Sequence, residues 1–101
     1  MIEKMTKEMF AESLNTKFRV NAGSDRSIEL ELVELSEGVS TPKHEQFALL
    51  FRGPSDFFLP QGIYNMEHER LGEFDLFLVP VGRDERGFQY EAVFNRFIEP
   101  S

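Results

Sequence analysis

FDLFLVPVGRDERGFQYEAVF, residues 74–94, carries the strongest β-sheet signal in this sequence. Its first part, residues 74–81, is apolar except for Asp75, which is typical of a strand covered on both faces. Residues 82–87 form a charged loop bounded by glycines. After this loop, apolar residues recur at every second position: Phe88, Tyr90, Ala92 and Phe94. The spacing and the turn chemistry together predict a β-hairpin.

Four segments nearer the N-terminus predict further strands. Residues 17–20 form a first short strand, and residues 63–68 follow a tight turn at residues 60–62. In residues 28–32 and 47–51 apolar and polar residues alternate, as they do in half-buried strands. Each of these segments adds one strand to the hairpin.

The apolar phase slips by one residue in the second predicted strand. Leu32 completes one alternating set, Val33 follows at once, and Leu35 continues the new set. A one-residue shift of the apolar face is what a β-bulge produces, so we predict a bulge between Leu32 and Val33. The polar residues 36–43 that follow predict a loop.

Residues 6–15 predict a short N-terminal helix. Thr6 can cap its start, and Asn15 tolerates the left-handed conformation that often ends a helix. The apolar residues of this segment recur at three- and four-residue spacing: Met5, Met9, Phe10 and Leu14.

These segments predict one mainly β domain that spans residues 1–101. We expect a six-stranded antiparallel meander, closed as a small barrel or folded as a two-sheet sandwich, with one N-terminal α-helix. A chain of 101 residues has room for one core, and eleven Phe residues supply large side chains to fill it.

The strand at residues 74–81 is apolar in both phases, so a single core can bury only one set of its side chains. We expect the N-terminal helix to cover the second set. Any patch that stays exposed near Phe77, Val79 or Val93 is predicted to bind a partner or a second copy of the chain.

Composition limits the classes of function. The chain has no Cys, which excludes disulfides, thiolate metal sites and a cysteine nucleophile. A formal net charge of −7 argues against direct nucleic-acid binding and against adhesion to anionic lipid, and it favours a basic partner. Residues 1–12 carry charges rather than an apolar run, so we expect no export signal, no membrane insertion and a cytoplasmic location.

His68, between two glutamates, is the residue that most suggests acid–base chemistry or metal binding. In a strand, however, His68 shares a face with Tyr64, while Glu67 and Glu69 point to the other face. We therefore expect His68 to end a strand and to hydrogen-bond a turn. A metal would also need His44 from another segment, and we predict neither a metal nor a cofactor.

Arg52 is a second candidate, because an arginine at a strand end can hold a carboxylate with two hydrogen bonds. Pairing inside the chain, with Asp56 or Glu45, is the interpretation we favour, since carboxylates are abundant here. No serine lies in a nucleophile-elbow pattern, and the glycines are isolated turn residues. We predict no catalytic residue.

The acidic residues Glu29, Glu31 and Glu34 suggest a different role, that of a nucleic-acid mimic that occupies a basic cleft. Acidic residues on the solvent face of a strand are also an ordinary means of keeping a sheet soluble. A small acidic inhibitor remains an alternative hypothesis.

Several blocks resemble a family of short bacterial proteins of unknown function, about 100 residues long. These are residues 47–54, 59–64, 67–68, 71–72, 76–82 and 90–95, and Phe10, Leu14 and Phe18 fit the same pattern more loosely. Asn15 stands where the family pattern has Gly, and both residues accept positive φ. The resemblance implies no known activity. It implies a loose association with genes for phage-tail-collar-like proteins, which gives slight support to an assembly role.

The leading hypothesis is a non-enzymatic module that binds another protein or its own copies as a homo-oligomer. Two alternatives stay open. One is the small acidic inhibitor, and the other is a small hydrolase or metal-assisted enzyme centred on His68. The candidate interaction residues are Arg52, Tyr64, His68, Phe77, Val79 and Val93.

Overall fold

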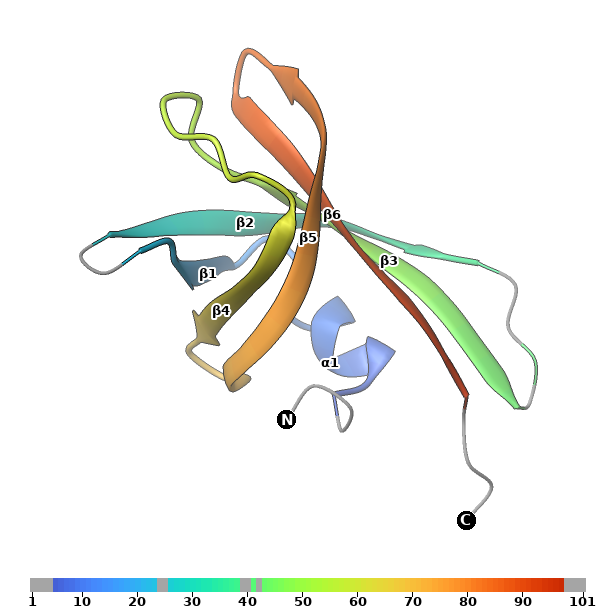
Figure 1. The fold of residues 1–101 in the computed structure, drawn as a ribbon. Helices are drawn as coiled ribbons and strands as arrows, with labels where there is room; N and C mark the ends of the chain where they lie inside the picture. The colour runs from blue at the N-terminus through green and yellow to red at the C-terminus, as the bar shows by residue number, and fades with distance from the viewer. Residues whose placement is uncertain (1–4, 24–25, 39–40, 42, 98–101) are drawn as a thin grey trace.

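The computed structural model describes residues 5–23, 26–38, 41 and 43–97. Its elements are α1 (Lys7–Ala11), β1 (Lys17–Asn21), β2 (Ser27–Glu37), β3 (His44–Arg52), β4 (Gly62–His68), β5 (Gly72–Asp84) and β6 (Gly87–Phe97). All strand pairs are antiparallel, and the sheet closes on itself as a barrel in the order β1-β2-β3-β6-β5-β4 (Figure 1). The prediction of a mainly β fold with six antiparallel strands and one helix is confirmed. Of the two predicted arrangements, barrel and sandwich, the structure has the closed barrel.

The strand order departs from a simple meander at one connection. β1-β2-β3 and β4-β5-β6 are each meanders of successive strands, but β3 pairs with β6 rather than with β4. The segment between β3 and β4 contains Gly53, Pro54 and Pro60 and is too long for a tight hairpin. It instead spans one end of the barrel, where Leu59 is buried and its backbone N–H donates to the Tyr90 hydroxyl at 2.9 Å.

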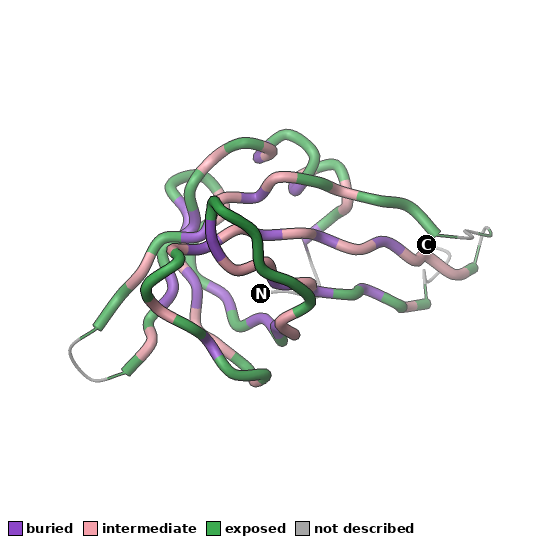
Figure 2. Tube along the Cα trace, turned by 90° about the horizontal axis from the view of Figure 1, so that it is seen from above, coloured by how far each residue is buried: buried purple, intermediate pink, exposed green. Residues whose placement is uncertain are grey.

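Buried and exposed residues alternate along the strands, as Figure 2 shows. The inward positions form one continuous core. From the strands these are mainly Phe18, Val20, Leu30, Leu32, Phe47, Leu49, Phe51, Met66, Phe74, Leu76, Leu78, Tyr90, Ala92 and Phe94. The described residues contain no helix long and apolar enough to cross a membrane.

The predicted bulge is confirmed. Leu32 pairs with Phe51 and Glu34 pairs with Leu50, so Val33 is the extra residue on β2. A second irregularity, which we did not predict, lies at Val81: Pro80 pairs with Tyr90 and Gly82 with Gln89. Bulges bend a strand and increase its twist, which helps a six-stranded sheet to close.

The helix is shorter than the predicted residues 6–15, because only Lys7–Ala11 is α-helical and turns follow. Thr6 is the N-cap: its side chain accepts a hydrogen bond from the Met9 backbone N–H at 3.1 Å. Asn15 has a φ of 65°, the left-handed conformation expected of it.

The prediction that the helix covers the outer side of β5 is wrong. Phe10 is fully buried, and its ring lies 5.4–6.2 Å from the rings of Phe47, Phe74 and Phe94, which all point into the barrel. The helix therefore closes one end of the barrel. A ring inserted into an open barrel end loses more contact with water than one laid on a convex outer face.

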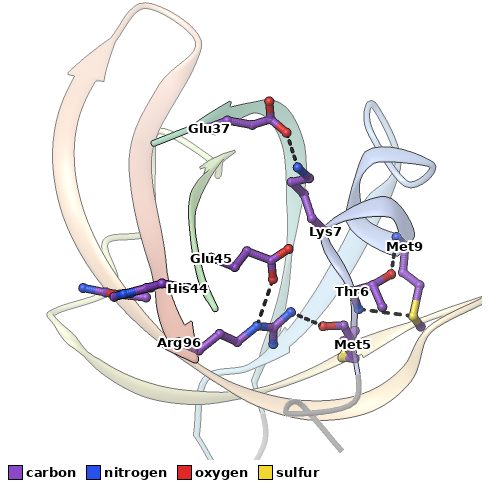
Figure 3. Close-up of polar contacts among 9 residues, drawn as sticks. Met5, Thr6, Lys7, Met9, Glu37, His44, Glu45 and Arg96 are labelled. Carbon is purple, nitrogen blue, oxygen red and sulfur yellow. Dashed lines mark hydrogen bonds and ion pairs between the residues drawn. The ribbon is translucent and has the colours of Figure 1, made fainter. Parts of the chain in front are cut away.

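Polar contacts hold the N-terminal segment at this end (Figure 3). Arg96 donates from Nε to Glu45 at 3.2 Å and from Nη2 to the Met5 carbonyl oxygen at 2.6 Å. Lys7 on the helix forms an ion pair with Glu37 at the end of β2. Arg96 thus joins β6, β3 and the start of the helical segment.

Candidate functional site

His68 is the last residue of β4, and its side chain is buried against Phe18, with ring centroids 4.3 Å apart. Its Nδ1 accepts hydrogen bonds from the backbone N–H groups of Arg70 at 3.0 Å and Leu71 at 3.2 Å. Its Nε2 lies 2.8 Å from the Thr16 hydroxyl oxygen. His68 therefore ends a strand and bonds a turn, as expected.

These contacts assign the tautomer of His68. Two backbone donors point at Nδ1, so this atom carries no proton, and the proton sits on Nε2. The Thr16 hydroxyl donates to the Ser13 carbonyl oxygen at 2.6 Å and is free to accept from Nε2. Burial lowers the pKa of His68, which favours this neutral form. Both ring nitrogens are occupied, so His68 has no atom left to take a substrate proton.

Tyr64 points inward, and its hydroxyl donates to the Pro60 carbonyl oxygen. It therefore ties β4 to the segment that spans the barrel end. Burial raises the pKa of this phenol. Tyr64 and His68 share a face of β4, as predicted, but each is engaged in a separate local contact.

Phe77 and Val79 lie on the outside of β5, and Val93 lies on the outside of the neighbouring strand β6. Phe77 pairs across the ladder with Ile63 of β4. Val79 pairs with Glu91, and Val93 is the next outward residue after Glu91 on β6. Ile63 is 71% exposed, Val93 66% and Phe77 48%, while Val79 is half-buried. We call Ile63, Phe77, Val79 and Val93 the apolar outer face.

Ile63 was not among the predicted interaction residues. The signal was present, because residues of a strand alternate in direction and His68, Tyr64 and Met66 all point inward. Ile63 therefore had to point outward. The charged residues at outward positions near these apolar side chains are acidic: Glu67, Glu73, Asp75 and Glu91. Arg83 lies further along β5, in the hairpin.

Arg52 lies on the other side of the barrel, at the end of β3. Its Nη2 is 3.6 Å from an Asp84 carboxylate oxygen, so the predicted partners, Asp56 and Glu45, are wrong. Glu45 pairs with Arg96 instead. Asp84 lies in the β5–β6 hairpin, which the ring closure places beside β3.

Arg52 belongs to a set of outward charged residues on β1, β2 and β3, which we call the charged outer face: Lys17, Arg19, Glu29, Glu31 and Arg52. Opposite charges alternate across the strands, because Lys17 pairs in register with Glu31, and Glu31 with Arg52. Lys17 and Glu31 form an ion pair at 3.5 Å. Arg19 pairs with Glu67 of β4 at 3.1 Å and lowers the pKa of that carboxyl.

A depression of about 660 Å³ opens at the Arg52 end of this face, and we call it the mixed-charge pocket. It is lined by Lys17, Ser27, Ile28, Glu29, Glu31, Arg52, Gly53, Pro54 and Arg86. A smaller depression, of about 460 Å³, lies beside His68 between Arg19 and Glu69.

The described residues contain no group of three or more His, Asp or Glu side chains arranged to hold a metal ion. His44, which a metal site at His68 would have required, lies on β3. It hydrogen-bonds Asn95 and packs against the ring of Phe97. The two histidines therefore make separate contacts.

Comparison with known proteins identifies the family of the chain but no activity or ligand. Residues 5–94 match the model of a family described as a domain of unknown function, DUF6916, and the chain belongs to this family. The matched region begins just before the helix and ends within β6, so it includes α1, β1 to β5 and most of β6. No curated protein matches the chain, and no solved structure matches it.

Proposed function

We propose that this domain is a non-enzymatic protein-interaction module and that the apolar outer face is its docking surface. The observation that carries the proposal is the exposure of Ile63, Phe77 and Val93 on adjoining strands, left open because the helix closes the barrel end instead. Covering such a side chain contributes about 1.5–3 kcal/mol. Large apolar side chains that stay exposed on neighbouring strands are typical of an interaction surface.

The charges around the apolar outer face indicate the charge that a partner should carry. Every charged residue at an outward position on β4, β5 and β6 between Gly62 and Val79 or between Glu91 and Phe97 is a carboxylate. A partner that presents an apolar strip with lysines or arginines at its rim complements this arrangement. A second copy of the chain would bring further carboxylates toward it, so we favour a different protein over self-association.

The alternatives have weaker support. Both nitrogens of His68 are engaged, which argues against a hydrolase centred there. Glu29 and Glu31 alternate with Lys17, Arg19 and Arg52, so they do not form the uninterrupted negative row of a nucleic-acid mimic. An assembly role also fits the resemblance to short bacterial proteins associated with phage-tail-collar-like genes.

Site-specific photocrosslinking in the native host tests the proposal. A photoreactive amino acid at Val93 should form an adduct with a second protein, and the same probe at Glu29, on the charged outer face, should not. Binding of the captured protein should weaken by about tenfold or more in Phe77→Asp, as expected when a central apolar contact becomes a buried charge. Binding should also weaken as salt increases.

A matched variant, Glu73→Gln, keeps the apolar face and removes one carboxylate, so it should weaken binding by much less than Phe77→Asp and should reduce the dependence of binding on salt. Sedimentation of the purified protein addresses self-association. A dimer that Phe77→Asp dissociates would identify a second copy as the occupant and contradict the heterologous partner. Equal crosslinking from Val93 and Glu29 would contradict the docking face itself.

A further inference from the structure

The mixed-charge pocket lies away from the proposed docking face, where three parts of the chain meet. These are the start of β2 at Ser27 and Ile28, the end of β3 with Gly53 and Pro54, and the β5–β6 hairpin at Arg86. The hairpin packs closely on the end of β3: the Gly53 backbone N–H donates to the Phe88 carbonyl oxygen at 2.9 Å. The pocket is therefore held by strand ends and not by a long loop.

Arg52 in this pocket is incompletely paired. Its Nε is buried and has no hydrogen-bond partner in the described part of the chain. Among the residues that the structure describes, its one ion-pair contact is to Asp84, at 3.6 Å through Nη2. A guanidinium has five N–H donors, and a buried donor without an acceptor is costly, so Arg52 is poised to gain from an additional anion.

Two further charges of the pocket have no ion-pair partner among the described residues. They are the Arg86 guanidinium and the Glu29 carboxylate, since Arg19, which faces Glu29 in register, pairs with Glu67. The remaining pair, Lys17 and Glu31, is long, at 3.5 Å. The pocket thus offers unpaired charge of both signs.

We propose that the mixed-charge pocket binds a small ligand that carries both a carboxylate and an ammonium group. Arg52 and Arg86 donate hydrogen bonds to the carboxylate, and Glu29 and Glu31 accept hydrogen bonds from the ammonium group. A ligand with only a negative charge would meet the two glutamates, and one with only a positive charge would meet the arginines. A volume of about 660 Å³ lies within the range of small-molecule sites.

Asp84 is the intramolecular competitor of the ligand carboxylate. Its side chain is 43% exposed and its contact with Arg52 is long. It is also held by the Arg86 backbone N–H at 2.8 Å and by Gln89 at 3.1 Å. When the ligand carboxylate takes the place of Asp84 on the guanidinium, Arg52 can form the two-pronged contact that carboxylates prefer.

Nuclear magnetic resonance titration of the whole chain tests this site with defined probes. The probes are ω-amino acids from 4-aminobutyrate to 6-aminohexanoate, with hexanoate and hexylamine as matched molecules that carry one charge each. We expect at least one ω-amino acid to shift the Arg52 Nε–Hε signal and the Gly53 amide. Its dissociation constant should be about tenfold or more below those of hexanoate and hexylamine, as one additional charge pair allows.

Variants separate the roles of the two ends. Arg52→Gln and Arg86→Gln should each weaken the binding of the ω-amino acid by about tenfold. Asp84→Asn should strengthen its binding, because this variant removes the anion that competes for Arg52. Glu29→Gln should bring hexanoate close to the ω-amino acid in affinity. Arg70→Gln, which removes an exposed arginine outside the pocket, should change nothing.

Two outcomes would overturn the proposal. Equal affinity for hexanoate and the ω-amino acids would exclude recognition of both charges. Absence of any shift at Arg52 and Gly53 up to millimolar probe would exclude the site. Because Arg86 lies on an exposed hairpin, Arg86→Gln still tests the carboxylate end of the pocket if Arg52→Gln fails to fold.

Discussion

The two outer faces of this barrel differ in composition although the strands beneath them bury the same kind of side chain. On β1, the first half of β2 and the end of β3, the outward positions carry the alternating charges of the charged outer face. On β4, β5 and β6 they carry Ile63, Phe77 and Val93, with carboxylates around them. The inward residues of both halves form one core. The barrel therefore requires only its inward residues, and the outer residues are free to carry interactions.

The largest expected effect contrasts the two sides of one strand. Leu78 is fully buried and Phe77, its neighbour on β5, is 48% exposed. Leu78→Ala should lower the free energy of unfolding by about 2–5 kcal/mol, because it leaves a cavity in the core. Phe77→Ala should lower it by less than half as much. Urea unfolding of both variants measures this, and equal losses would show that the outer side of β5 is also part of the core.

The next effect concerns the hairpin beside the charged outer face. A Cβ on Gly87 would lie 1.8 Å from the Gly53 carbonyl oxygen, and Gly87 has a φ of +138°. Gly87→Ala should therefore lower the free energy of unfolding by about 2 kcal/mol or more. The new side chain is strained at this φ, and it also forces the backbone of the hairpin away from Gly53. Gly72 also has positive φ, at +82°, but nothing lies within 4 Å of its Cβ position. Gly72→Ala should cost about 1 kcal/mol, from the strained φ without a clash. Thermal unfolding compares the two, and a cost for Gly72→Ala as large as that for Gly87→Ala would argue against the close packing of the hairpin on β3.

A smaller effect is expected from pH, through His68 between the two faces. Burial holds the pKa of His68 below its ordinary value of 6.5. The unfolded chain therefore binds a proton before the folded protein does, and stability should fall as pH drops through 6.5 toward the folded pKa. Above this range the contribution is fully present. Urea midpoints measured from about pH 7.5 down to about pH 5.5 follow the change.

One variant isolates the contribution of His68 from that of the carboxylates. Asn at position 68 can still accept from the Arg70 N–H but does not titrate, so His68→Asn should flatten the pH dependence. An unaltered slope in His68→Asn would mean that another group titrates.

The smallest effect belongs to the ion pairs of the charged outer face. Lys17 and Glu31 are 3.5 Å apart and partly exposed. Lys17→Gln should change the free energy of unfolding by at most about 1 kcal/mol, and high salt should remove the difference. Chemical unfolding in low and high salt tests this. A salt-independent loss above that size would indicate that the charged outer face contributes more to the stability of the fold than exposed ion pairs do.

The local features of the fold could be predicted because they depend on neighbouring residues. The β5–β6 hairpin, the bulge at Val33, the Thr6 cap and the positive φ of Asn15 each follow from side-chain period, turn chemistry or the steric limits of one residue. The same alternation predicted that His68 shares a face of its strand with Tyr64, and the expected hydrogen bonds of His68 to a turn are present.

Features that join distant parts of the chain could not be predicted in this way. The pairing of β3 with β6, the place of Phe10 inside the barrel end and the contact between Arg52 and Asp84 all depend on how the ring closes. The alternation of apolar residues in a strand predicts which side chains are buried. It does not predict which strand lies beside it, because several strand orders bury the same residues. The apolar outer face and the mixed-charge pocket exist only where that closure brings separate strands together.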